Sequence, residues 1–144
     1  MKDFNYYIKQ GDVRKTTRDL SLAESLIKRS NENASYVLKL ELTNEGASIV
    51  FKTIYDSLRE AVDAILILEG YRSYSHQASI IFLKKFNELS EEDLNKLDNF
   101  RIKRNNSLYY GKSITLDETK EIAGFYKNKI GIILRIINNL KRVK

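Results

Sequence analysis

The stretch at residues 47–69 carries the most regular apolar pattern in the sequence. Its apolar side chains recur at intervals of three and four residues, the spacing that places them on one face of an α-helix. The stripe consists of Val50, Ile54, Leu58, Ala61, Ile65 and Leu68, and Phe51, Val62 and Leu66 widen it. Gly70 follows, and glycine often ends a helix. Because so wide an apolar face must be covered by other elements, we expect residues 47–69 to form the central helix of a bundle.

Helical patterns that begin at capping signals account for most of the remaining sequence. Ser21 with Glu24, and Thr115 with Glu118, have the spacing of a capping box, in which two side chains satisfy backbone N–H groups at the start of a helix. The predicted helices cover residues 21–42, a short segment after Ser75, the segment from Ser90 to about residue 110, and the segment from Thr115 to the C-terminus.

The composition agrees with a helical fold. The 144 residues include no proline and six glycines, which favours helices with few sharp turns. No alternating pattern predicts a β-strand, and the length fits one domain. We therefore predict an all-α fold, a single-domain up-and-down bundle of four to five helices over residues 1–144. Residues 1–20 form an N-terminal extension, in which residues 3–10 can be a short helix and residues 12–20 are charged and irregular.

Several classes of site and location are excluded or disfavoured. The chain has no cysteine, so it has no disulfide framework and no thiolate metal site. With one histidine and no tight carboxylate group, we expect neither a metal nor a cofactor. No apolar run approaches the roughly 18 residues of a membrane span, and no secretory segment is visible, so we expect a cytoplasmic protein without membrane contact. The net charge of +6 favours a polyanionic partner, although a solvated lysine-rich surface explains it equally well.

A group of polar side chains closes the helix that starts at Ser90. Arg104 and Asn105 are followed one turn later by Tyr109 and Tyr110, and Gly111 marks the helix end. A planar cation, an amide and two phenols within one and a half turns can bind a phosphate or a nucleobase. The alternative for the two tyrosines is packing in the core or in a dimer interface, with the hydroxyls outward.

This group resembles a known family signature. The run from Arg104 to Gly111 is similar to the Arg-Asn-x-x-x-His-Tyr-Gly motif of the HEPN domain superfamily (higher eukaryotes and prokaryotes nucleotide-binding). Further segments in the order of small archaeal and bacterial members are Tyr55 to Ala61, Leu68 to Tyr71, and Ser75-His76. The resemblance, which runs from about Leu22 to the C-terminus, implies a helical bundle that forms a homodimer with both motifs in one cleft.

The resemblance also implies an activity and a partner. Catalytic HEPN proteins are metal-independent ribonucleases, some of them toxins silenced by a separately encoded nucleotidyltransferase. By this resemblance the candidate catalytic residues are Arg104, Asn105 and Tyr109. The transferase modifies a tyrosine two positions after the motif histidine, which is Gly111 here, and Tyr110 is the neighbouring candidate.

One departure from the motif changes the expected chemistry. Tyr109 stands where the family has histidine, and a phenol with a pKa of about 10 is ionised in only roughly one molecule in a thousand at pH 7. Tyr109 can donate a hydrogen bond to a phosphate or stack on a base. The departure therefore favours binding of RNA or a nucleotide over cleavage. Three hypotheses remain: a ribonuclease of toxin–antitoxin or defence type, a catalytically inactive nucleotide- or partner-binding module, and an assembly subunit.

Other polar residues are candidates for binding the same ligand. These nucleotide- or RNA-binding candidates are Arg104, Tyr110, Asp56, Arg59 and His76. Asp56 can orient Arg104, form a purely structural salt bridge with it, or pair with Arg59 within its own helix. His76 is the sole histidine. It can replace the missing base if its loop faces the motif, or it can make a local hydrogen bond at a helix start.

Overall fold

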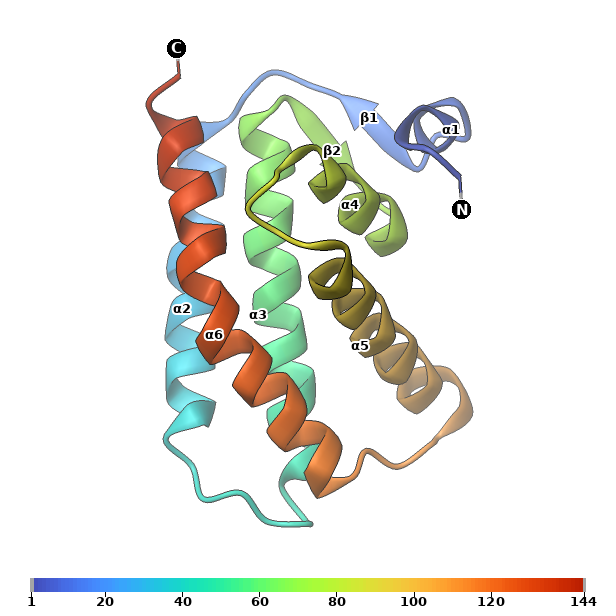
Figure 1. Cartoon of the computed structure of the whole chain (residues 1–144), viewed down its shortest axis with the longest axis vertical. Coiled ribbons are helices and arrows are strands. Elements are labelled where there is room, and N and C mark those ends of the chain that lie inside the picture. The colour runs from blue at the N-terminus through green and yellow to red at the C-terminus, as the bar shows by residue number, and fades with distance from the viewer. Residues whose placement is uncertain (1, 144) are drawn as a thin grey trace.

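The computed structural model describes residues 2–143, and helix α3 (Ala47–Leu68) lies at its centre (Figure 1). Phe51, Ile54 and Ile65 on this helix have no exposed surface. Gly70, just beyond the helix, has a φ of 87°, a left-handed conformation that glycine adopts without strain. The prediction of a central helix that ends at this glycine is confirmed.

Three further long helices complete an up-and-down bundle. Helices α2 (Leu20–Leu38) and α6 (Leu116–Lys141) pack along α3, and α5 (Glu91–Tyr110) lies on its other side. The chain descends in α2, ascends in α3, descends in α5 and ascends in α6 (Figure 1). The predicted all-α class is confirmed.

Most predicted helix starts are confirmed, and one is wrong. Ser90 and Thr115 each form a capping box, with Asp93 and Glu118 as their respective partners. Helix α2, in contrast, is capped by Asp19, whose Oδ1 accepts a hydrogen bond from the Leu22 N–H at 3.0 Å. Aspartate is as strong an N-cap as serine and lies two residues earlier in the chain, so the helix starts before the predicted capping box.

A small β-sheet that the sequence did not predict joins the N-terminal segment to the segment after α3. Helix α1 (Phe4–Lys9) is the expected short helix. Strand β1 (Val13–Lys15), from the segment expected to be irregular, pairs antiparallel with β2 (Tyr71–Ser73), so the expectation of no strands was wrong. Three residues are too few to show an alternating pattern. The sheet places α1 beside α4 (His76–Phe82), which continues into the 3₁₀ helix η1 (Leu83–Lys85).

The second half of α5 is only partly covered by the rest of the chain. Phe100 is the last buried residue of this helix, and the residues from Arg101 to Tyr110 are intermediate or exposed. Leu108, Tyr109 and Tyr110 at the end of the helix are 56%, 71% and 76% exposed. The end of the motif region, from Leu108 to Tyr110, is therefore exposed, whereas Arg104 remains largely covered.

Within residues 2–143, no helix is both long enough and apolar enough to cross a membrane.

Candidate functional site

Three arginines follow the boundary between α3 and α5, and we call them the arginine row: Arg59, Arg101 and Arg104. Each contacts a carboxylate, but only one contact is short. The distances from Nε to the carboxylate oxygen are 3.9 Å for Arg59 to Asp63, 2.8 Å for Arg101 to Asp98, and 3.9 Å for Arg104 to Asp56. Two of the three guanidinium groups are therefore held by loose ion pairs, which leaves hydrogen-bonding capacity for another acceptor.

Arg104 is the most unusual member of the row. Its side chain is 20% exposed, and its Nε and Nη1 atoms are buried without a hydrogen-bond partner in the described structure. Buried polar groups are nearly always hydrogen-bonded, and leaving a charged donor unpaired is costly. Asp56 lies beyond hydrogen-bonding distance of Nε, so these two donors have no acceptor among the described residues.

Tyr55 and His76 join α3 to α4 next to the arginine row. The Tyr55 hydroxyl is hydrogen-bonded to Nδ1 of His76. Burial, assisted by the charges of Arg59 and Arg101, lowers the pKa of His76 to about 3. Burial also raises the pKa of the Tyr55 phenol. Both groups are therefore neutral near pH 7, and with the phenol as donor the imidazole carries its proton on Nε2.

Asp63 is a second perturbed group on α3. Its Oδ1 accepts a hydrogen bond from the Ser79 hydroxyl at 3.3 Å, and its Oδ2 is the atom that faces Arg59. Burial raises the pKa of Asp63 to about 6, against the lowering effects of Arg59 and Ser79. A carboxyl group with this pKa can exchange a proton near neutral pH.

The predicted site residues fall into two groups. Asp56 faces Arg104 across the helix boundary, as expected, whereas Arg59 pairs with Asp63 one turn further along α3 rather than with Asp56. His76 is the first residue of α4, as the alternative of a residue at a helix start expected, but its hydrogen-bond partner Tyr55 lies on α3.

The motif residues after Arg104 are less enclosed. Asn105 is partly covered, while Tyr109 and Tyr110 are exposed at the end of α5, so their packing in the core of this chain was wrong. Gly111 caps the helix in a left-handed conformation, as predicted. The two phenols are thus accessible but lie one to two turns beyond Arg104.

Sequence reasoning gave no role to three residues of this site: Tyr55, Asp63 and Arg101. Two of them carried a usable signal, because Arg101 lies three residues before Arg104 and Asp63 lies four residues after Arg59, spacings that share a helix face. Tyr55 carried no such signal, since its contact depends on how α4 packs on α3.

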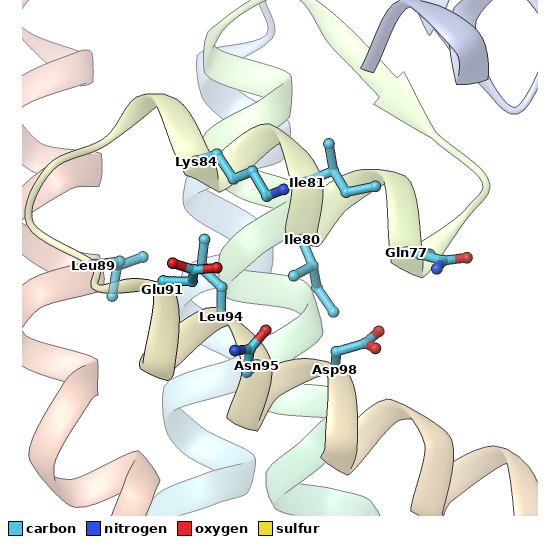
Figure 2. A pocket seen from close by; sticks show the side chains of 9 residues that line it. All are labelled: Gln77, Ile80, Ile81, Lys84, Leu89, Glu91, Leu94, Asn95 and Asp98. Atoms are coloured by element: carbon cyan, nitrogen blue, oxygen red, sulfur yellow. The ribbon is translucent and has the colours of Figure 1, made fainter. Parts of the chain in front are cut away.

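A groove between α4 and α5 lies beside these residues, and Figure 2 shows the side chains that line it. It encloses about 500 Å³. The residues from α4 and η1 face those from α5 across the opening (Figure 2). The lining residues are Gln77, Ile80, Ile81, Lys84, Leu89, Glu91, Leu94, Asn95 and Asp98. Its wall combines four apolar side chains with five polar or charged ones.

The described residues contain no group of three or more histidine, cysteine or carboxylate side chains that could hold a metal ion. Comparisons with protein-family models, with curated proteins and with solved structures find no match for this chain.

Proposed function

We propose that this protein is a HEPN-like module that binds RNA or a nucleotide by placing a phosphate against the arginine row. The observation that carries the proposal is the pair of buried, unpartnered nitrogen atoms of Arg104. A guanidinium group offers several N–H donors in a fixed plane, and phosphate oxygens accept them in pairs. A phosphate would therefore supply the acceptor that Asp56 leaves missing.

The charges around the row support an anionic ligand. Asp56 and Asp63 each lie 3.9 Å from their arginine, so neither forms a tight, two-pronged contact that a phosphate would have to break. The chain as a whole carries a net charge of +6, which favours the approach of a polyanion.

The exposed end of α5 supports a homodimer as the binding form. Ile102 and Leu108 are 42% and 56% exposed, and they lie on the same helix as the motif. A second copy that covered this half of α5 would bury apolar surface and bring two copies of Arg104 toward one another. The proposed RNA-binding groove would then be lined by both chains.

Ribonuclease activity is a second candidate, and His76 favours it. Its imidazole is neutral near pH 7 and lies within the electrostatic influence of Arg59 and Arg101. A neutral imidazole can accept a proton from a ribose hydroxyl, the task that Tyr109 performs poorly, once Nδ1 of His76 releases the Tyr55 hydroxyl. A bound phosphate would offset only the arginine charges, which lower the pKa of His76 less than burial does.

Binding is tested with a fluorescent single-stranded RNA and fluorescence anisotropy. Arg104→Ala is expected to lower affinity at least tenfold and to reduce the salt dependence of binding, because one phosphate contact is lost. Arg135→Ala is the matched control, since Arg135 is an exposed arginine on α6. Equal losses in both variants would show that only overall charge matters, and an unchanged affinity in Arg104→Ala would refute the proposed site.

Cleavage is tested with end-labelled RNA in excess chelator. A nuclease that uses this site would lose activity in Arg104→Ala and His76→Ala. An inactive wild-type protein that gains cleavage on Tyr109→His would instead identify a binding module on a nuclease scaffold. RNA binding without cleavage in either protein would exclude the nuclease hypothesis and leave the binding proposal intact.

A further inference from the structure

The groove between α4 and α5 is built from two matching helical faces. Gln77, Ile80, Ile81 and Lys84 contribute from one side, and Glu91, Leu94, Asn95 and Asp98 contribute from the other. Within each set the spacing is zero, three, four and seven residues, so each set is one continuous face. Figure 2 shows the two faces opposite one another, with Gln77 and Asp98 toward one end, Lys84 and Glu91 toward the other, and Asn95 between Leu94 and Asp98. The groove thus has the size and the mixed lining of a small-molecule site.

One end of this groove adjoins the arginine row. Asp98 lines the groove and accepts a hydrogen bond from Nε of Arg101 at 2.8 Å. Ile80 lines both the groove and the small hollow that contains Arg59 and His76. A ligand in the groove would therefore reach the arginine row without crossing another element.

We propose that this groove binds the nucleoside part of the nucleotide whose phosphate contacts the arginine row. The inference rests on the proposed function and adds the location of the base and the sugar. The Asp98 carboxylate, next to Arg101, is placed to accept a hydrogen bond from a ribose hydroxyl. The base then extends toward the far end, between the apolar side chains of Ile80 and Leu94.

Two further polar groups that line the groove, those of Asn95 and Glu91, suit the edge of a nucleobase. The Asn95 amide both donates and accepts hydrogen bonds, and the Glu91 carboxylate accepts them from a base amino group. Apolar side chains cover the faces of a base without selecting among bases, whereas amide and carboxylate groups read its edge. A ligand with only a phosphate and a sugar would leave the apolar side chains of the groove uncovered.

The groove is tested by following the side-chain amide NMR signals of Asn95 and Gln77 in the full-length protein. The probes are adenosine, guanosine, adenosine 5′-monophosphate and ribose 5-phosphate. We expect both nucleosides and the monophosphate to shift the two amide signals, and ribose 5-phosphate to shift only the Nε signals of the arginine row. If ribose 5-phosphate binds as tightly as the monophosphate and neither nucleoside moves the amide signals, the groove is not the nucleoside site while the phosphate proposal survives. If no probe binds, the proposed function fails together with this inference.

A substitution of Asn95 tests the placement of the base independently of the NMR signals. Asn95→Ala is expected to weaken adenosine 5′-monophosphate binding about fivefold to tenfold, the loss of a typical hydrogen bond, while leaving ribose 5-phosphate binding unchanged. Asn138→Ala is the control, because Asn138 is an exposed helical asparagine on α6. Equal monophosphate affinity in both variants would overturn the role of Asn95 and with it the placement of the base.

Discussion

Nε of Arg104 lies 3.9 Å from Oδ1 of Asp56, so α3 and α5 bring opposite charges together without a hydrogen bond between these two atoms. The carboxylate is 51% exposed and leaves Nε and Nη1 of the guanidinium without a hydrogen-bond partner. Such a loose and partly solvated pair adds little to stability. In the proposed phosphate complex, Asp56 would therefore compete with the phosphate for Arg104.

Asp56→Asn is expected to raise the affinity for ribose 5-phosphate severalfold. The substitution removes a negative charge from the position that a phosphate would approach, and the amide retains a similar shape. Titration calorimetry measures the change. Glu32→Gln, at an exposed position on α2, alters the net charge by the same amount away from the row. An equal gain in both variants would indicate a long-range effect of charge rather than competition at Arg104.

Tyr55→Phe is expected to lower the free energy of unfolding by about 1 kcal/mol. The substitution removes the hydroxyl that is hydrogen-bonded to His76 and leaves a buried ring nitrogen without its partner. Urea denaturation measures the loss. Tyr109→Phe is the matched control, because the Tyr109 ring is 71% exposed and its change should leave stability within error. A Tyr55→Phe protein as stable as the wild type would show that this hydrogen bond contributes nothing.

The helices were predictable because their signals are local. The apolar stripe of residues 47–69, the capping boxes at Ser90 and Thr115, and the glycine after α5 each depend on neighbours within one or two turns. The pairing of β1 with β2 was not predictable, since each strand has three residues and its partner lies far away in the chain.

The candidate site was predictable only in part, for a related reason. Arg104 and Asp56 were identified from residue type and helical position, and their contact follows from the packing of two long helices. The neutral pair of Tyr55 and His76, the raised pKa of Asp63 and the groove beside α4 all depend on how a short helix packs on α3 and α5. That packing does not produce a periodic pattern of residues in the sequence.

The stability of the fold should depend on pH through Asp63. Burial raises its pKa to about 6, so the folded state disfavours the charged carboxylate, and this group lowers stability as pH rises from about 4 through 6. Asp63→Asn keeps an acceptor for the Ser79 hydroxyl and removes the charge. We expect its melting temperature to exceed that of the wild type above pH 6 and to approach it near pH 4. Thermal denaturation across this range measures the effect, and a constant difference at every pH would contradict the assignment.

His76 should make the fold less stable as pH falls, the opposite of the effect of Asp63. Its pKa is lowered to about 3, below the ordinary value of about 6.5, so the unfolded chain binds a proton more readily than the folded one between these values. The contribution of neutral His76 to the stability of the fold is therefore fully present above about pH 6.5 and is lost as pH falls toward 3. The test compares the Asp63→Asn protein with the double variant that also carries His76→Gln, so that Asp63 does not contribute to the difference. We expect the free energy of unfolding of the double variant to fall less steeply over this pH range. An NMR titration of His76 with a midpoint near 6.5 would refute the prediction.

Leu108→Lys is expected to convert a homodimer into a monomer. Leu108 is 56% exposed on the part of α5 that the chain itself leaves partly covered, four residues after Arg104 and on the same face. A charge at the centre of an apolar contact must be desolvated without a partner, and this cost opposes association. Light scattering at micromolar concentration measures the mass of each protein. Leu40→Lys provides the control, because Leu40 is 44% exposed just beyond the end of α2, on a different element. A monomeric wild type would exclude the shared groove, while dissociation by Leu40→Lys alone would move the interface to the end of α2 and away from Arg104.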